Sequence, residues 1–217
     1  MKSLIVIPAR NGSKRLKNKN KKFFLGRPLI EHTINFAKKI DITPYILVST
    51  NDKDILNIAL KKKVLTPWLR PSNLSKDSSS SYSFTIHAIK WFKKTFGDLD
   101  CVILLQPTTP YRKISTIKKM INIFNKDKNS VAAFTTKLNE DKKLFYIKNE
   151  KKIEFKKKEG LKANILGSIY INSVKNLMKY KSFVNIQTTP YITKIPKEII
   201  DIDTHADYKL AKQLLKK

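Results

Sequence analysis

The sequence predicts an α/β fold: a Rossmann-like, mostly parallel sheet with helices on both faces, plus a small β-rich arm. Three runs of apolar, mostly β-branched residues, at 3–7, 45–49 and 101–105, do not alternate with polar residues. Continuous apolar runs of this length are typical of parallel strands buried on both faces. Helical patterns separate the runs, and strand–helix alternation is the order of an α/β fold with right-handed crossovers.

Four segments have the features of helices. They are residues 28–39, 52–62, 82–95 and about 204–216. In the first, Ile30 and Ile34 fall on one apolar face, and Pro28 suits a first helical turn. Thr204 followed by Asp207 resembles a capping box, which predicts the start of the last helix.

The stretch from about 130 to 172 differs from the rest of the chain. SVAAFTT at 130–136 and ILGSIYIN at 165–172 have strand character, and LFYIKNEKKIEFKKK between them suggests a hairpin with a turn at Asn149–Glu150. We therefore expect one domain over residues 1–217, with residues 137–170 forming an arm. This arm is too apolar in places to lie bare, so it is a candidate dimer contact.

Composition excludes several classes of protein. The 217 residues suit one compact domain. No apolar run approaches the roughly 20 residues that span a bilayer, and the first residues lack the pattern of a signal peptide, so we expect a cytosolic protein. The single cysteine, Cys101, lies in an apolar run and indicates a core residue.

The formal net charge of +28 raises the possibility of a non-catalytic basic protein that binds nucleic acid. Only five of the 45 basic residues are arginines, and the lysines occur in nearly every segment. Bidentate recognition of phosphates and bases uses arginine. The charge thus fits a composition bias as well as a binding surface, and nucleic acid is an unfavoured partner.

The strongest functional signal is the set of polar segments that follow the three apolar runs. They are PARNGSKR at 8–15, STND at 49–52 and QPTTPYR at 106–112. Ligands of open α/β sheets bind beyond the carboxyl ends of the strands, so this convergence predicts a polyanionic or nucleotide ligand. Gly12 allows main-chain N–H groups to face phosphate oxygens. A merely solvated basic loop would have the same composition. The GxGxxG and GxxxxGK[ST] motifs are absent, which argues against a dinucleotide dehydrogenase and a P-loop NTPase.

The segment DID at 201–203 suggests a metal site. If it forms an extended strand, Asp201 and Asp203 face one side, and Ile200 and Ile202 face the core on the other. We expect this pair opposite the basic loop, at the other end of the site. Paired carboxylates repel unless a cation is near, and Mg²⁺ accepts one or two carboxylates together with substrate phosphate. Alternatively, Asp203 stabilises the start of the last helix.

Five segments in order resemble the acylneuraminate cytidylyltransferase, or CMP-sialic acid synthetase, family. They are PARNGSKRLKNKN at 8–20, LGRPLI at 25–30, LRP at 69–71 with Asp77 and the serines to Ser81, LLQPTTPYR at 104–112, and DIDT at 201–204. The resemblance spans nearly the whole chain. It implies a single nucleotidyltransferase domain that couples CTP to a nine-carbon acidic sugar of the sialic, legionaminic or pseudaminic type, giving CMP-sugar and pyrophosphate. It also implies Mg²⁺ as cofactor and a homodimer.

The same resemblance implies a set of site residues. For the nucleotide they are Ala9, Arg10, Asn11, Gly12, Ser13, Lys14, Lys19, Asn20, Arg70, Ser80 and Ser81. For the sugar they are Gln106 and Tyr170, and Lys143 or Lys162 is the candidate to replace the family's usual cation where this chain departs from the pattern; the DID segment adds Asp201 and Asp203 for the metal. Arg10, Lys19, Gln106 and Asp203 are expected to act in catalysis. An ordinary polar loop and a helix cap would also explain Arg70 and the serines.

The identity of the sugar stays open at this point. Family members often have an arginine-rich segment and an Asn-Gly pair where this chain has LKANILGSIYIN, with lysines nearby. A 3-deoxy-octulosonate cytidylyltransferase performs the same chemistry and is the alternative. Its sequences resemble PARxxSxRLPGKPL, and the Lys19–Asn20 pair together with LLQPTTPYR argues against it here.

Overall fold

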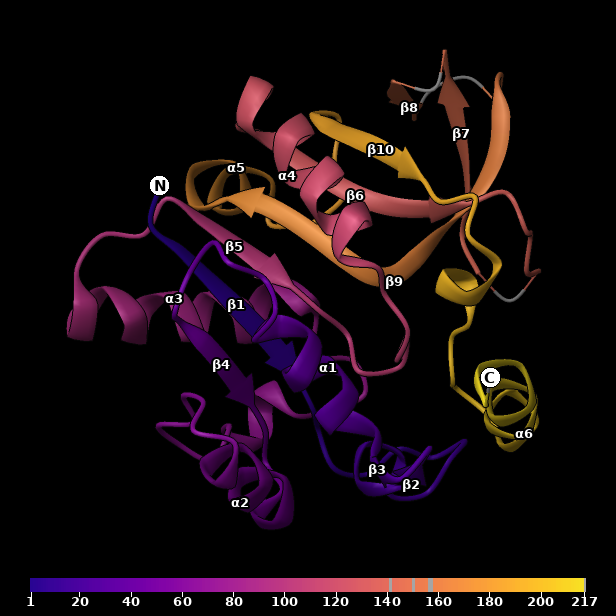
Figure 1. The fold of residues 1–217 in the computed structure, drawn as a ribbon. Coiled ribbons are helices and arrows are strands. Elements are labelled where there is room, and N and C mark those ends of the chain that lie inside the picture. Colours follow the sequence, from indigo (N-terminus) through magenta and orange to yellow (C-terminus); the bar gives the residue numbers. More distant parts are fainter. Residues whose placement is uncertain (141, 150, 156–157, 217) are drawn as a thin grey trace.

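The computed structural model describes residues 1–140, 142–149, 151–155 and 158–216, and its centre is one mixed sheet (Figure 1). The main strands are β1 Ser3–Pro8, β4 Ile46–Ser49, β5 Cys101–Leu104, β6 Ser130–Thr135, β9 Leu161–Ser173 and β10 Thr188–Ile192. Their order is β10-β6-β9-β5-β1-β4. Within it β9 is antiparallel to both neighbours, and all other pairs are parallel. The predicted mostly parallel sheet is therefore confirmed.

Helices cover both faces of this sheet, as predicted (Figure 1). One face carries α1 Leu29–Ala37, α2 Lys53–Lys61 and α4 Ile114–Asp127, and the other carries α3 Ser81–Phe96 and α5 Val174–Tyr180. Strand β1 shows why helices cover both faces of the sheet. Ile5 and Ile7 enter the first core cluster, whereas Leu4 and Val6 enter the second. Successive side chains of a strand point to opposite faces, and each buried one contributes roughly 1.5–3 kcal/mol.

Helix α4 lies in a segment to which the sequence analysis assigned no element. Its buried residues Ile117, Met120, Ile121 and Phe124 follow the three- and four-residue spacing of an apolar helix face. The helix ends at Lys128, which adopts the left-handed conformation with φ 51°. This helix was therefore readable from the sequence.

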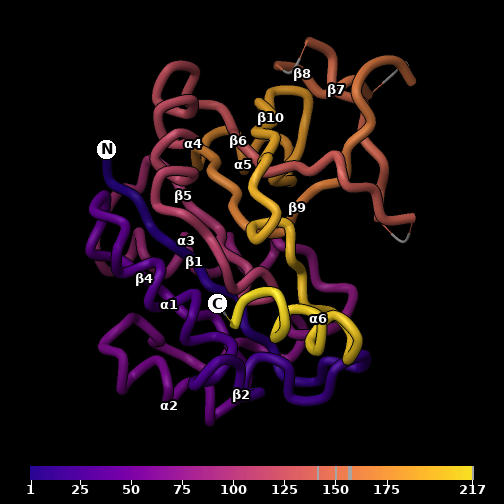
Figure 2. The backbone as a smooth tube through the Cα atoms, turned by 45° about the vertical axis from the view of Figure 1, so that its right-hand side comes forward, coloured from indigo at the N-terminus to yellow at the C-terminus, as the bar shows by residue number. Residues whose placement is uncertain are grey.

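The arm is the hairpin of β7 Leu144–Lys148 and β8 Lys152–Glu154, and β7 pairs with the first half of β9. Figure 2 shows it standing away from the amino-terminal half of the sheet. Asn149 has φ 51°, as a tight turn requires, and its predicted turn partner Glu150 lies outside the described residues. Residues 165–171 belong to the main sheet, so the arm is shorter than the predicted 137–170.

The carboxyl-terminal segment closes the molecule against its amino-terminal third. Helix α6 His205–Leu215 packs through Tyr208 and Ala211 onto Leu16 and Phe24 (Figure 2). The capping box of Thr204 is present as predicted. The strand expected at DID is wrong: residues 200–203 follow the short helix Pro196–Ile199 and form no ladder.

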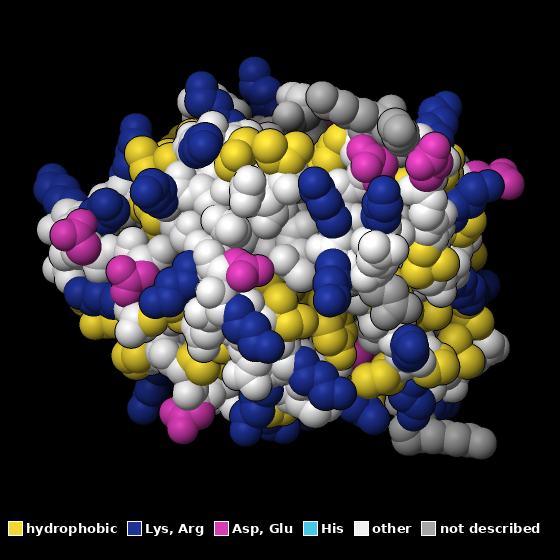
Figure 3. Space-filling model, turned by 90° about the horizontal axis from the view of Figure 1, so that it is seen from above, with side chains coloured by type: hydrophobic (Ala, Val, Ile, Leu, Met, Phe, Trp, Pro, Cys, Tyr) yellow, Lys and Arg dark blue, Asp and Glu magenta, His cyan; other side chains and the backbone are white. Residues whose placement is uncertain are grey.

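Three short helical turns and a two-stranded ribbon complete the described elements. They are η1 Lys19–Lys21, η2 Ser72–Leu74, η3 Pro196–Ile199, and the ribbon of β2 Phe23–Phe24 with β3 Arg27–Pro28. In the described part of the chain, no helix combines the length and apolarity needed to cross a membrane. On the face shown in Figure 3, lysine and arginine side chains are dispersed and acidic ones lie between them.

Candidate active site

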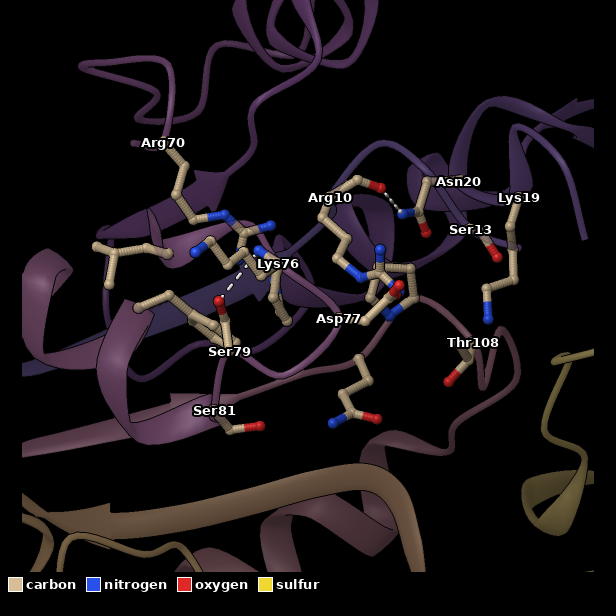
Figure 4. A pocket seen from close by; sticks show the side chains of 15 residues that line it. Arg10, Ser13, Lys19, Asn20, Arg70, Lys76, Asp77, Ser79, Ser81 and Thr108 are labelled. Carbon is tan, nitrogen blue, oxygen red and sulfur yellow. Dashed lines mark hydrogen bonds and ion pairs between the residues drawn. The ribbon is translucent and has the colours of Figure 1, made fainter. Parts of the chain in front are cut away.

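A cavity of about 180 Å³ opens at the carboxyl edge of β1, β4 and β5 (Figure 4). Three segments far apart in the sequence line it. They are the loop after β1 with Pro8, Arg10, Ser13, Lys19 and Asn20, the region before and at the start of α3 with Arg70, Leu74, Lys76, Asp77, Ser79, Ser81 and Phe84, and the residues after β5, Gln106, Pro107 and Thr108. The predicted convergence is thus observed for the segments after β1 and β5, whereas none of residues 49–52 lines this cavity and Asp52 lines a smaller adjoining hollow.

Short hydrogen bonds fix the loop after β1. The main-chain N–H of Asn11 donates to the Asn51 side chain at 2.7 Å, and the Asn20 amide donates to the Arg10 carbonyl at 3.1 Å (Figure 4). Gly12 has φ +80°, a conformation that favours glycine. Asn11 and Gly12 line a smaller adjoining hollow. Ala9 is fully buried and donates its N–H to Ser49, so it extends the strand pairing and does not line the cavity.

Asp77 lies against two cations of this loop. Its carboxylate contacts the Arg10 guanidinium, and the Lys14 ammonium is 3.3 Å away. The hydrogen bond from Lys14 and the positive charge of Arg10 hold the pKa of the Asp77 carboxyl below its usual range. Lys14 is exposed and reaches the cavity only through Asp77. The Asp77 carboxylate therefore occupies the position beside the Arg10 guanidinium that a phosphate group of a ligand would take.

Arg70 is the least satisfied cation of the cavity. It is 4% exposed, and its Nε and Nη2 have no hydrogen-bond partner among the described residues. Its guanidinium lies over the Phe84 ring, 5.0 Å from the centroid. Burial, with the charge of Arg10, lowers its pKa to about 10, so it stays protonated at neutral pH. Burying N–H donors without acceptors costs free energy, so the site suits a ligand that supplies hydrogen-bond acceptors to Arg70.

The two predicted serines have different roles. The Ser80 hydroxyl accepts a hydrogen bond from the Ser83 N–H at 3.1 Å and caps α3, so the helix-cap interpretation holds for it. Ser81 lines the cavity. Ser79, which the sequence analysis did not select, also lines it and accepts from the Lys76 N–H at 3.1 Å (Figure 4).

Gln106, which was predicted to face the sugar, lies two residues after the end of β5 and lines this first cavity. Arg112, the last residue of the same sequence motif, is 7% exposed and does not line the cavity. Its guanidinium donates to the carbonyls of Gln106 and Ser168, and to the Thr33 hydroxyl. Burial lowers its pKa to about 9. Arg112 thus fixes the loop that carries Gln106.

A second cavity, of about 900 Å³, lies between the base of the arm, the segment at 196–204 and α6. Asp201 and Asp203 both line it, and so does Ile200, which was expected on the opposite side, whereas Ile202 is buried in the third core cluster as expected. Asp203 contacts Lys19 at 2.7 Å and Arg15 at 3.0 Å. The expectation that the aspartates lie opposite the basic loop is wrong, because α6 brings Asp203 onto that loop.

The electrostatics of the two aspartates differ. Burial acts to raise the pKa of Asp203, but the hydrogen bond from Lys19 and the charges of Lys19, Arg15 and Lys142 outweigh it, so the net pKa is lowered. Asp201 pairs with Lys142 through one oxygen, and its Oδ1 is buried without a hydrogen-bond partner among the described residues. Lys19 lines the first cavity and holds an aspartate of the second, so the two cavities meet at this ion pair.

Two residues predicted for the sugar lie elsewhere. The Lys143 ammonium sits over the Phe145 ring, 5.1 Å from its centroid, and Lys142 lines the second cavity in its place. Neighbouring side chains of an extended segment point in opposite directions, which the sequence motif alone could not resolve. Tyr170 packs in the second core cluster against Phe183, and burial raises its pKa. Lys162, the other candidate cation, is exposed and lines neither cavity.

An open, mostly parallel α/β sheet with a cation-rich cavity at its carboxyl edge defines a protein of the nucleotide-binding class. The chain belongs to the cytidylyltransferase family, whose model matches residues 4–217.

Two curated relatives match almost end to end. The CMP-N,N'-diacetyllegionaminic acid synthase of Legionella pneumophila is 36% identical, over 99% of this chain and 97% of its own length. The pseudaminic acid cytidylyltransferase of Campylobacter jejuni is 30% identical, over 100% of this chain and 97% of its own. Among solved structures, the CMP-2-keto-3-deoxy-manno-octonic acid synthetase complexed with CTP superposes with a TM-score of 0.76, covering 100% of this chain and 99% of its own. At 16% identity, this likeness shows the shared fold.

Proposed function

We propose that this enzyme transfers the cytidylyl group of CTP to a nine-carbon acidic sugar, releasing pyrophosphate. The observation that carries the proposal is Arg70, a buried guanidinium whose Nε and Nη2 have no partner in the described part of the chain, in a cavity whose lining adds Arg10, Lys19 and Lys76. Such a cavity suits a ligand that combines phosphates with carbonyl or ring-nitrogen acceptors, as CTP does.

In this mechanism the protein positions the substrates and neutralises charge. Arg10 and Lys19 face the triphosphate, Lys14 adds its charge from the far side of Asp77, and the Arg70 fork donates to acceptors of the cytosine ring with Ser81 beside it. The anomeric oxygen of the sugar forms a bond to the α-phosphorus while the bond to the pyrophosphate oxygen breaks. Transfers of this type depend on alignment and electrostatic stabilisation more than on covalent help. The basic loop stabilises the charge of the departing pyrophosphate.

The second cavity is the proposed sugar site because it joins the first through Lys19 and Asp203. Lys137 and Lys142 supply cations for the sugar carboxylate, and Leu138 and Leu166 supply an apolar wall for acyl groups. Gln106 faces the sugar from the first cavity. The two relatives that match end to end are named for legionaminic and pseudaminic acid, and this supports the nine-carbon class over an eight-carbon octulosonate.

Mg²⁺ is the proposed cofactor. Within the described residues, no group of three or more His, Cys, Asp and Glu side chains is placed to hold a metal ion. Mg²⁺ needs only one or two carboxylates when it also binds substrate phosphates. The unpartnered Asp201 Oδ1 and the Asp203 carboxylate fit that need. When bound, the ion would neutralise phosphate charge and lower the pKa of the attacking hydroxyl.

A homodimer remains part of the proposal. The arm exposes fewer apolar residues for a dimer contact than its sequence suggested. Four of its apolar residues are buried within the chain itself: Phe145, Ile147, Ile153 and Ala163. Leu144, Phe155 and Leu161 stay exposed on the arm. We propose that these residues contact a second copy, and a monomer in light scattering at working concentration would contradict this. The expected cytosolic location also stays a proposal.

A pyrophosphate-release assay tests the activity. CTP, UTP and ATP are each combined with legionaminic, pseudaminic and N-acetylneuraminic acids and with the eight-carbon octulosonate. We expect turnover with CTP and at least one nine-carbon acid. Equal turnover with UTP would contradict the nucleotide assignment, and a preference for the octulosonate would contradict the sugar class.

A further inference from the structure

Strand β9 contains an irregularity beside the first cavity. Tyr170 of β9 pairs with Ala132 of β6, and Ile165 pairs with Phe134, so the single residue Ala133 faces the four residues 166–169. Extra residues in one strand of an antiparallel pair form a bulge, and bulges near functional sites redirect side chains. Gly167 lies in this bulge.

Gly167 leaves space that a side chain of the site occupies. A Cβ added to Gly167 would lie 2.3 Å from Oε1 of Gln106 and 3.2 Å from its Cδ. The backbone of Gly167 does not have the positive φ that favours glycine, which Gly12 does have. The absence of a side chain at 167 therefore serves the close approach of the Gln106 amide and not the backbone conformation.

The main chain of Gln106 is fixed to the same bulge. Arg112 donates from Nη2 to the Gln106 carbonyl and from Nε to the carbonyl of Ser168, at 3.0 Å. Ser168 directly follows Gly167, so one buried guanidinium joins the backbone of Gln106 to the strand against which its amide lies. With Oε1 against Gly167, the Nε2 end of the amide is the more distant from the strand.

We infer that Gly167 is a positioning residue, which sets the direction of the Gln106 amide toward the acidic sugar. The inference deepens the proposed function, since the role of Gln106 in contacting the sugar rests on that proposal. A methyl group at 167 would meet the far end of a flexible side chain, so the amide can turn away without disturbing the sheet. Substitution should therefore change the kinetics for the sugar more than the stability.

The kinetic test uses Gly167→Ala alone and combined with Gln106→Ala. In the wild-type background we expect Gly167→Ala to lower kcat/KM for the acidic sugar at least about tenfold, with KM for CTP changed less than about twofold. In the Gln106→Ala background it should cost less than about twofold, because the added methyl then meets no amide. Equal losses in the two backgrounds, or an unchanged single variant, would overturn the inference.

Gly97→Ala is the matched control. It adds the same methyl group at the end of α3, where the nearest atom is Lys2 Nζ at 3.9 Å, but Gly97 has φ +82°. Alanine is strained there, so we expect a lower melting temperature with unchanged kinetics for the sugar. Gly167→Ala should show the reverse pattern.

A second measurement does not depend on activity. The chain has three glutamines, Gln106, Gln187 and Gln213, so selective ¹⁵N labelling gives three side-chain amide pairs in an NMR spectrum. Gly167→Ala should shift the Gln106 pair and leave the other two in place. If the wild type turns over no acidic sugar while this shift is seen, the proposed function fails and the positioning stands. If no shift is seen, the positioning fails.

Discussion

The two cavities of this protein differ in the balance of the charged side chains that line them and in whether these side chains are already paired. Among the described residues, the first is lined by four cations, Arg10, Lys19, Arg70 and Lys76, and one anion, Asp77. The second is lined by three cations, Arg15, Lys137 and Lys142, and four anions, Glu140, Asp201, Asp203 and Asp207. The first has an excess of positive charge and unpaired guanidinium donors, whereas Asp203 and Asp201 of the second already contact lysines.

This difference shows why the net charge of +28 says little about the ligand. A triphosphate suits the cavity with free donors. A single sugar carboxylate needs fewer cations, and the second cavity offers Lys137 and Lys142 together with an apolar wall that includes Leu138 and Leu166. The ion pair of Lys19 with Asp203 joins the two cavities, so we expect a substitution at this pair in one cavity to affect the other.

Asp203→Asn should have the largest effect and tests whether the second cavity takes part in the chemistry. We expect turnover to fall about a hundredfold or more at saturating Mg²⁺ and substrates, as on removal of a strong electrostatic group. CTP binding should change little, because Arg10 and Arg70 remain. The exposed Asp98, mutated to Asn, serves as control. Normal turnover in Asp203→Asn would show that the carboxylate serves only its ion pairs with Lys19 and Arg15.

Arg70→Lys tests the unpaired donors of the first cavity. Lysine keeps the charge but loses the planar fork, so we expect the affinity for CTP to fall about tenfold or more, in line with a lost charged hydrogen bond. Calorimetric titration with CTP, compared with UTP, measures this. The melting temperature reports any loss of packing on Phe84. If the variant binds CTP as the wild type does, the donors do not face the nucleotide.

Asp77→Asn should have a smaller effect of opposite sign. The Asp77 carboxylate contacts Arg10 and Lys14, so a phosphate must compete with it. We expect the affinity for CTP to rise about two- to fivefold at low salt, since exposed ion pairs are weak, and the gain should shrink as salt is added. Weaker binding would mean that Asp77 holds the basic loop in its binding conformation.

The pH dependence of stability gives the smallest effect. The pKa of Asp203 is lowered in the folded protein, so its ion pairs stabilise the fold above the unfolded-state pKa of about 3.9. This contribution is lost as the pH falls through the lower folded-state value. Between pH 5 and pH 3, the melting temperature of Asp203→Asn should therefore fall less than that of the wild type, by up to a few degrees. Parallel curves would contradict the charge assignment.

The sequence by itself determined the fold class and most elements. The apolar runs became β1, β4 and β5, and the polar segments after β1 and β5 line one cavity, whereas Asp52 of the segment after β4 lines only the smaller adjoining hollow. Local signals were sufficient here because a strand buried on both faces requires a continuous apolar run, and the Thr204 capping box is completed within one helical turn.

Only the tertiary structure decided which similar residues do different work. Arg70 has N–H donors without a partner among the described residues, whereas the buried Arg112 donates to two main-chain carbonyls. Both arginines belong to polar sequence motifs. Lys142 lines a cavity and Lys143 does not. These outcomes depend on contacts between residues that are far apart in the sequence. Arg112 contacts Thr33, which is 79 residues away, and Arg15 contacts Asp203, which is 188 residues away. Sequence spacing constrains neighbours within a turn or strand, and it leaves such contacts to the packing of the whole chain.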